Sequence, residues 1–471
     1  MRHNLEPSWK RRRWGLLDGI YILSILLAAN YALAFGQTAD AASDSRGQDL
    51  SASAKPVVLT LDEVIKRAEA NEPAYAASSA ASKTSALDRS IARAGLLPSI
   101  DYHNQALYTQ ANGLTNQAGQ GASLQPSPRF IANNAVREYA SQAVINETLG
   151  LGQLAGIRRA DAAAALAAAE QEIARRGLVV AVTGLFYGSV AAEHKLAVAE
   201  RAHKEAADFN VLTSKREQAR EAAHADVVKA QLVEQQRRRE WEDARVAAEK
   251  ARLELGVLLF PDPRTAYVLK AADETPALPS RAEVDEAAAR YNPELKSALA
   301  ALDVSNADVL TARAGFLPSL GMNVTYGIDA PQVAVNGPDG ARNLGYSASV
   351  TLDIPVWDWL ATQHKVKQSE IRRDATRVAL SVAQRRVIAR LDEMYSEAAA
   401  ARDQLVSLDE SVATAAESLR LTKLRYTSGE ATVLEVVDAQ TAYVSVENAR
   451  EDGRVRYQAA RADLETLTGT M

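Results

Sequence analysis

The stretch RAGLLPSI at residues 93–100 returns as RAGFLPSL at residues 313–320, 220 positions later. Pro73 and Pro293 are separated by the same 220 positions. Self-similarity at a fixed spacing indicates that a chain contains an internal duplication. The chain is therefore expected to fold as two related halves.

A second match sets the size of the repeat. The dipeptide AQ at residues 230–231 matches AQ at residues 439–440, but at a spacing of 209 positions. The drop from 220 to 209 requires a net deletion of about eleven residues in the second copy, which a shorter loop between its strands would supply. We expect a first repeat at residues 57–272 and a second at residues 273–471, each with a helix, two strands and a helical hairpin.

Pro98 and Pro318 are expected to mark the change from helix to strand in the two repeats. Proline lacks an N–H, and the residue before it avoids helical dihedrals, so a helix usually stops there. Behind Pro318, apolar residues occupy every second position at residues 320–328 and again at residues 346–354, with polar or small residues between them. These two segments are the expected strands of the second repeat.

The same pattern is less clean in the first repeat, at residues 100–108 and about 139–145. Alternation over about ten residues is the weak signature of a transmembrane β-strand with apolar side chains outward and polar side chains inward. A half-buried strand in a soluble sheet would show the same alternation. Both interpretations stay open on the pattern alone.

Helical periodicity follows each pair of strands. Between residues 391 and 422, apolar or small residues recur in five successive pairs at spacings of three and four, which is the seam of a coiled coil. We expect long helices at residues 359–426 and 152–219, each about 100 Å long at ~1.5 Å per residue. The flanking helices at residues 61–97 and 221–256 are about half as long, so two of them could run end to end beside one long helix.

Four strands per chain are too few to close a membrane barrel, because the smallest barrels have about eight. An open strand edge in hydrocarbon leaves backbone groups without hydrogen bonds, which a membrane does not tolerate. Several copies must therefore pool their strands. The expected fold class is mainly α with membrane β, with a two-fold internal repeat, long coiled-coil hairpins and four strands per chain in a shared barrel.

The first 56 residues have a different composition. The basic residues 10–13 precede an apolar run at residues 15–35, which contains the small-x-small sequence ALA at residues 32–34. We expect a signal peptide at residues 1–34 that is removed on export, and a flexible segment at residues 35–56. About 20 apolar residues could also span a bilayer, so a transmembrane anchor is the competing interpretation. The cleavage pattern and the polar stretch behind it favour removal.

Composition excludes several classes of protein. The 471 residues include no cysteine, which excludes a disulfide scaffold, a thiolate zinc site and a cysteine nucleophile. The net charge of −5 argues against binding to nucleic acid. His194, His203 and His224 lie at intervals of 9 and 21 positions, which are not metal-ligand spacings. We find no catalytic, cofactor or metal site and expect no enzyme.

The chain resembles the TolC-like family of outer-membrane efflux proteins from about residue 59 to residue 467. The resemblance rests on the duplicated segments 93–100 and 313–320, and on LRYTSG at residues 424–429 followed by VLEVVDAQ at residues 433–440. It implies a homotrimer with one barrel of twelve strands, four from each chain, in the outer-membrane lipid. It also implies a periplasmic helical tunnel that is closed at its far tip, an adaptor protein in the periplasm and an inner-membrane pump behind the adaptor.

The resemblance places the turn of the second hairpin at Gly429, where the long helix must reverse. Glycine tolerates the left-handed backbone that such a turn needs. The first repeat has Arg220 at the corresponding position, so we expect its turn to be built differently.

By resemblance, Glu435 and Asp438 occupy the positions of the acidic residues that narrow the tip of the tunnel. They are three positions apart, so they share a face of one helix. Three copies would form two stacked acidic rings that attract cations. Solvated surface charges are the alternative. Tyr426 matches a tyrosine that ties neighbouring helices at the tip, but Ala431 stands where the family often has its partner arginine, which leaves that latch in question.

The leading hypothesis is a passive exit duct of a tripartite efflux pump or a type I secretion system, in the outer membrane with a long periplasmic portion. It would carry small molecules or proteins from the periplasm to the exterior. The alternative is an exported coiled-coil scaffold protein of the cell envelope without a pore. Clean alternation in the strands of the second repeat favours the duct, because a scaffold needs no lipid-facing strands.

Overall fold

The computed structural model describes residues 57–108, 137–271, 276–330, 332–337, 340 and 342–469, all within the unit that begins at Val57. The expected signal peptide and the segment behind it lie outside these residues. In chain order the elements are β1 (Val57–Leu59), α2 (Leu61–Asn71), α3 (Pro73–Ala94), β2 (Ser99–Tyr108), β3 (Arg137–Gly150), α4 (Leu151–Gln218), α5 (His224–Leu259), β4 (Tyr267–Leu269), α6 (Arg281–Tyr291), α7 (Pro293–Ala314), β5 (Ser319–Ala330), β6 (Leu344–Asp353), α8 (Ala361–Thr427) and α9 (Val433–Thr468).

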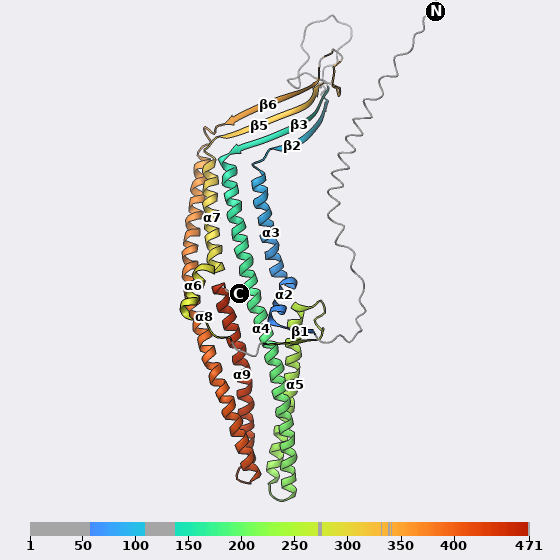
Figure 1. Ribbon diagram of the computed structural model, residues 1–471, viewed down its shortest axis with the longest axis vertical. Coiled ribbons are helices and arrows are strands. Elements are labelled where there is room, and N and C mark those ends of the chain that lie inside the picture. The colour runs from blue at the N-terminus through green and yellow to red at the C-terminus, as the bar shows by residue number, and fades with distance from the viewer. Residues whose placement is uncertain are drawn as a thin grey trace, which may run out of the picture. The chain divides into compact units, whose positions relative to one another are not determined.

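The same order of elements occurs twice. Two consecutive helices lead into a pair of strands, which are followed by a long helix and a shorter one (Figure 1). The long helices α4 and α8 have 68 and 67 residues, and their bounds lie within two residues of the expected ones. Each forms a hairpin with the shorter helix behind it: α4 with α5 and α8 with α9.

The structure corrects the helices that precede the strands. Residues 61–97 were expected to form one helix, but the chain breaks at Glu72 into α2 and α3. Pro73 is the first residue of α3, where a missing N–H costs nothing, and it holds Glu72 in an extended conformation. The second repeat breaks in the same way at Asn292, before Pro293.

Each long helix packs against two shorter ones. α3 and α5 both contact α4, and α7 and α9 both contact α8, as the lengths of the segments predict. α4 also contacts α7 and α9, so the two repeats are joined along α4. The four large strands lie at one end of these helices, and the α4–α5 and α8–α9 turns lie at the other end (Figure 1).

The large sheet is antiparallel with the strand order β2-β3-β5-β6. The pairing of β3 with β5 joins the strand pairs of the two repeats, with Ile145 opposite Val324. Among the described residues, no strand pairs with the outer edge of β2 or of β6. The sheet therefore ends in two free edges.

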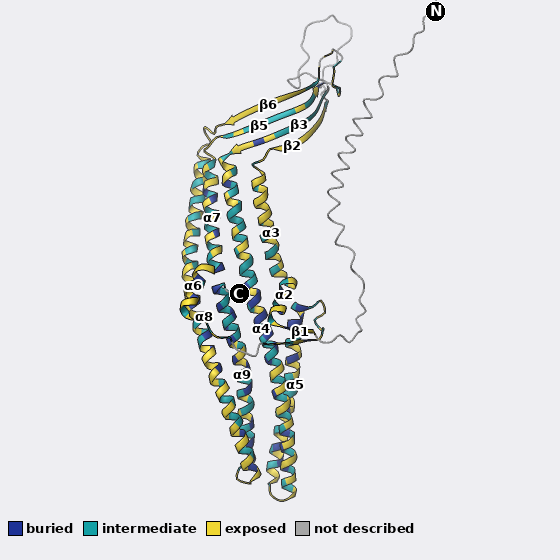
Figure 2. Ribbon diagram, in the orientation of Figure 1, coloured by how far each residue is buried: buried dark blue, intermediate teal, exposed yellow. Residues whose placement is uncertain are grey.

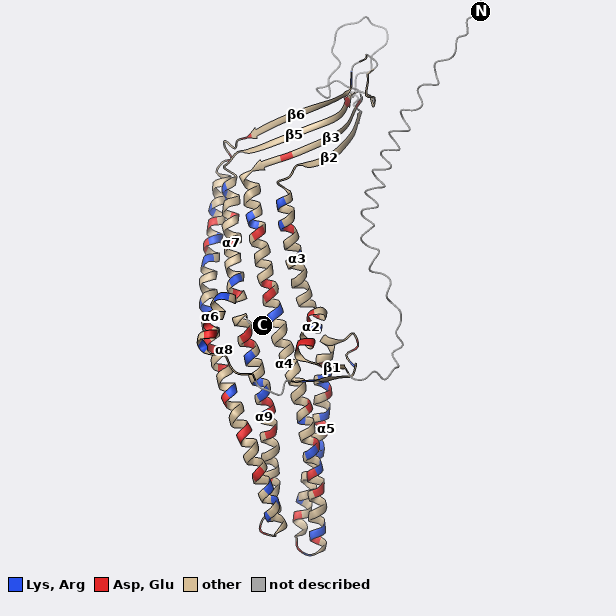
Figure 3. Cartoon of the chain, viewed as in Figure 1, with Lys and Arg blue, Asp and Glu red and all other residues tan. Residues whose placement is uncertain are grey.

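The register gathers apolar side chains on one face of the sheet. Val324 lies opposite Ala348 and Met322 opposite Val350, whereas Asn323 lies opposite Ser349 on the other face. Charged residues are sparse in the sheet and frequent along the helices (Figure 3). Much of the sheet is exposed in the single chain (Figure 2). Its more exposed apolar residues are Ile100, Tyr102, Tyr326, Tyr346, Val350 and Leu352.

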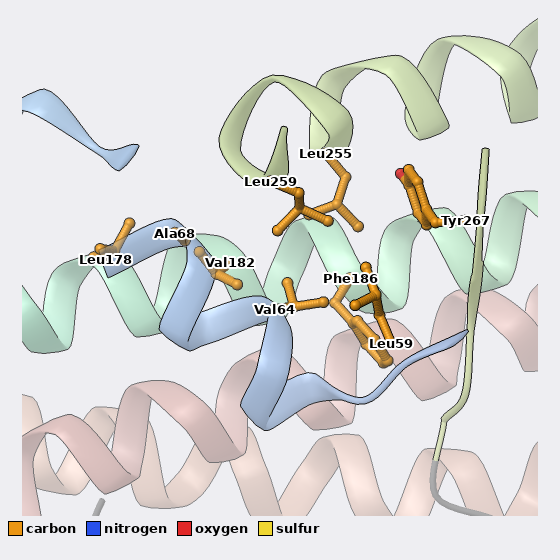
Figure 4. Packing of buried hydrophobic residues seen from close by; sticks show 9 residues of the cluster. All are labelled: Leu59, Val64, Ala68, Leu178, Val182, Phe186, Leu255, Leu259 and Tyr267. Atoms are coloured by element: carbon orange, nitrogen blue, oxygen red, sulfur yellow. The ribbon is translucent and has the colours of Figure 1, made fainter. Parts of the chain in front are cut away.

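A buried core lies where α2 and the short strands cover the middle of α4. β1 and β4 pair in parallel, and Leu59 and Tyr267 point with Val64 toward Phe186 of α4 and Leu255 of α5 (Figure 4). One stretch of α4 has the length and composition of a membrane span. In this fold α4 instead packs against several other elements, which accounts for its apolar composition.

Candidate functional site

The α8–α9 turn reverses at Gly429, whose φ of 79° lies in the left-handed region. The amide of Ser428 donates to the carbonyl of Leu424 at 3.1 Å, and the amide of Glu430 donates to the carbonyl of Arg425 at 2.8 Å. These bonds satisfy carbonyls that the end of α8 would otherwise leave open.

The expectation of a different turn in the first repeat is wrong. Arg220 has a φ of 63°, so it takes the same left-handed conformation as Gly429. The amide of Glu221 donates to the carbonyl of Arg216 at 2.7 Å, which repeats the bond at the second turn. A non-glycine residue in this conformation costs about 1–2 kcal/mol. The surrounding hairpin therefore imposes the turn on an unfavourable residue.

Glu435 and Asp438 are both exposed in the first turn and a half of α9. Glu435 is the third helical residue, and its carboxylate accepts from the amide of Thr432 at 3.1 Å. The Arg425 guanidinium lies 3.2 Å from the same carboxylate. The backbone N–H of Thr432, with its hydroxyl and Arg425, lowers the pKa of Glu435. Within the described chain no hydrogen bond or ion pair engages Asp438.

Tyr426 is buried between the two hairpins. Its ring centre lies 5.1 Å from that of Phe209, and its hydroxyl lies 3.3 Å from the Thr213 hydroxyl, both on α4. The guanidinium of Arg216 lies 4.8 Å from the ring centre and donates to the Tyr426 carbonyl at 2.6 Å. In this chain the arginine in contact with Tyr426 is thus Arg216, from the other hairpin.

Sequence reasoning missed Arg216 because the residue that it contacts lies 210 positions away. The spacing of 209 between the repeats aligns Arg216 with Arg425, which pairs with Glu435 instead. Repeat alignment would therefore have indicated an arginine at each tip, but not that the two have different partners.

A row of polar contacts joins α4 to α9 above the tip. Both oxygens of Glu447 accept from Arg201 at 3.0 Å. Nδ1 of His194 lies 2.9 Å from Glu451, and Nζ of Lys195 lies 2.5 Å from Asp452. The Glu447 and Glu451 side chains are almost fully buried. Nothing in the sequence pattern identified these pairs, because each partner alone reads as a helix-surface charge.

The three histidines of the first hairpin have different surroundings. His194 contacts Glu451, His203 stacks on Trp241 with 5.6 Å between ring centres, and Nδ1 of His224 lies 2.8 Å from Glu217. Among the residues that the structure describes, no three histidine, aspartate or glutamate side chains come together as metal ligands.

At the opposite end, Pro98 and Pro318 directly precede the first residues of β2 and β5, Ser99 and Ser319. The helices before them end at Ala94 and Ala314, with Gly95 and Gly315 as their C-cap residues. The duplicated segment is thus the connection between helix and sheet in both repeats.

Comparison with known proteins finds a family model and several relatives that each match part of the chain. A family model described as outer membrane efflux protein matches residues 284–470. Outer membrane protein OprJ of Pseudomonas aeruginosa is 28% identical over 176 residues, 36% of each chain. Alkaline protease secretion protein AprF of the same organism is 24% identical over 183 residues, 38% of this chain and 37% of AprF. The matches thus span well under half the length of these relatives.

The fold comparison covers most of the described chain. The CmeC outer membrane channel of Campylobacter jejuni aligns over 87% of this chain and 85% of its own, with a TM-score of 0.70 and 15% identity. At this identity the likeness concerns the fold, which is mostly helical. The relatives are channels rather than enzymes. The second repeat thus matches a family model for outer membrane efflux proteins, and the fold of most of the chain is similar to that of an outer membrane channel.

Proposed function

We propose that three copies of the chain form a passive exit duct of a tripartite efflux pump or a type I secretion system. The free edges of β2 and β6 carry this proposal, because a lipid-facing sheet must pair every edge. β6 of one copy would pair with β2 of the next, and three sheets of four strands would close a barrel of twelve. Among the described strands of one chain, none pairs with either of these edges.

Helices at the two sides of the same chain support this assembly. On α3, which contacts α4, Leu87 and Ile91 are about two thirds exposed. On α8, which contacts α7, Ile371 and Val378 are exposed to a similar degree. Apolar side chains on outer helices are expected to be covered by a neighbouring copy.

The helical hairpins would continue the barrel as a tunnel through the periplasm. Glu435 and Asp438, repeated three times around the axis, would form its narrow acidic mouth. Tyr426 and Gly429 would act as the latch and the turn that hold this mouth closed, with Arg216 as the partner of Tyr426. Opening requires the two hairpins of a chain to move apart.

Transport partners follow from the same proposal. By its resemblance to TolC-like channels, the trimeric duct would work with a periplasmic adaptor and an inner-membrane pump. One relative is named for secretion of a protease, so the cargo class includes proteins as well as small molecules. Export of the chain itself would remove the leader at residues 1–34, ahead of the segment 35–56 and the two repeats.

Cysteine labelling in intact cells separates a duct from a pore-free scaffold. The chain has no cysteine, so single substitutions give unique sites. Val324→Cys and Val350→Cys should be shielded from charged thiol reagents by lipid, whereas Asn323→Cys and Ser349→Cys should react through the aqueous pore. Equal reaction at all four sites would show that the strands do not form a membrane wall.

A further inference from the structure

The contact between His194 and Glu451 joins the two hairpins of one chain. His194 lies on α4 of the first hairpin and Glu451 on α9 of the second, with 2.9 Å between Nδ1 and Oε2. The Glu451 side chain is 4% exposed, whereas that of His194 is half exposed. A buried carboxylate is thus reached by a titratable group that solvent can protonate.

Charged groups surround this contact on every side. From α9, Arg450 and Arg454 donate to the second oxygen of Glu451 at 3.0 and 3.4 Å. Glu193 lies beside His194 on α4, and Lys270 follows β4. His194, Glu193, Glu451, Arg454 and Lys270 line one cavity of about 380 Å³. The positive charge of Arg252 on α5 also acts on Glu193.

We propose that the His194–Glu451 contact is a proton-operated clasp that holds the first hairpin against the second. With the imidazolium present, a charge-assisted hydrogen bond closes the seam between α4 and α9. When the imidazole loses its proton, the contact becomes a weaker neutral one and the hairpins separate more readily. The clasp rests on the proposed function only in that separation of the hairpins would open the duct.

The electrostatics set the direction of the pH effect. The hydrogen bond to Glu451 raises the pKa of His194, despite burial and the charge of Arg454. The proton is therefore bound more tightly in the closed seam than in an open one. The clasp is complete below the ordinary histidine pKa of about 6.5 and is lost as the pH rises through the raised value.

Two other ion pairs between the same helices contain no histidine. Arg201 pairs with Glu447, and Lys195 with Asp452, on the same two helices. Arginine and lysine keep their charge up to about pH 10. Among the described contacts between α4 and α9, the His194 pair is thus the one that a change from pH 5.5 to 8.5 would switch.

Distance measurement by pulsed electron paramagnetic resonance tests the clasp without depending on transport. Spin labels at Val211→Cys on α4 and Leu424→Cys on α8 report the separation of the hairpins near the tip. Both positions are exposed and the chain has no other cysteine. The full-length protein in detergent is mixed with excess unlabelled chain, so that each assembly carries one labelled copy.

The variants give opposite expectations. In the unsubstituted background the distances should shift to longer values and broaden between pH 5.5 and pH 8.5. His194→Gln should give the long distribution at both pH values, and His194→Lys, which keeps its charge, the short one at both. His224→Gln is the matched control, because its Glu217 partner lies in the same hairpin, and it should keep the pH response.

An unchanged distribution between the two pH values, or a pH response that persists in His194→Gln, would overturn the clasp. His194→Lys distinguishes loss of the clasp from misfolding: a substitution at this position that leaves the fold intact and keeps the charge must retain the short distribution. Current through a planar bilayer is recorded on the same samples. If the distances change with pH but no current is recorded, the clasp is supported and the proposed duct is contradicted.

Discussion

The guanidinium of Arg216 in the first hairpin donates to the carbonyl of Tyr426 in the second at 2.6 Å and lies 4.8 Å from the centre of its ring. A charge-assisted hydrogen bond and a cation–π contact are thus combined on one residue at the tip. Because the two residues belong to different hairpins, their contact opposes separation of the hairpins.

Arg216→Ala should increase the open probability in planar bilayers. Loss of the two contacts removes about 1–3 kcal/mol from the closed state, which corresponds to on the order of a tenfold change in the equilibrium or more. Lys215→Ala is the matched control, because it removes the same charge from the adjacent, exposed position. Equal effects of the two substitutions would show that Arg216 acts only through its charge.

Glu435→Ala combined with Asp438→Ala should abolish cation selectivity and block by multivalent cations. In the proposed trimer, six carboxylates would surround a narrow mouth and attract cations. Thr432 and Arg425 lower the pKa of Glu435, which favours its ionised form. Stability should fall only slightly, since the exposed Glu435 carboxylate also accepts from the amide of the N-cap residue Thr432. Single-channel recording in salt gradients measures the selectivity. Selectivity and block that survive the double substitution would place the constriction elsewhere.

Gly327→Ala should prevent assembly of the barrel, whereas Gly345→Ala should not. The two glycines lie opposite each other on β5 and β6. A Cβ at Gly327 would lie 2.2 Å from the carbonyl oxygen of Ser141, but one at Gly345 meets no atom within 4 Å. Backbone of β3 cannot withdraw without breaking the pairing that joins the repeats. The yield of heat-sensitive oligomer on gels measures the outcome, and equal yields would contradict this register.

Acid should destabilise the protein through Glu451. Burial raises the pKa of this carboxyl, but the bonds and charges of His194, Arg454 and Arg450 outweigh burial and lower it to about 2. The resulting stability is present above the ordinary value of 4.5 and is lost as the pH falls toward 2. It amounts to at most about 3 kcal/mol per chain.

Thermal unfolding between pH 5 and pH 3 measures this contribution. Glu451→Gln should be less stable than the unsubstituted chain at pH 5 and should lose less stability on acidification. Glu410→Gln, at an exposed position on α8, should behave like the unsubstituted chain. Parallel pH profiles for all three proteins would show that Glu451 does not contribute to the pH dependence of stability.

Local signals predicted the framework of this fold. Pro98 and Pro318 stand directly before the strands and cannot continue a helix, although the helices themselves end earlier, at Ala94 and Ala314. Alternating apolar residues define the faces of β5 and β6 whatever their partners. The break at Pro73 follows the same rule, although the helical periodicity on both sides of it concealed it.

The contacts between the hairpins could not be predicted in this way. Arg216 and His194 each lie on a long helix among other charges. Only the packing of α4 against α9, together with the contact of α4 with the end of α8, gives them their partners. Arg220 shows the opposite limit: its own preference argues against a left-handed turn, and the tertiary structure overrides it.

Native mass spectrometry of the protein extracted from outer membranes tests most directly whether several chains share one barrel. The free edges of β2 and β6 predict an assembly of three copies, with three times the mass of the processed chain. A monomer, or a protein that is recovered from the soluble periplasmic fraction instead of the membrane, would contradict the shared barrel and the duct built on it.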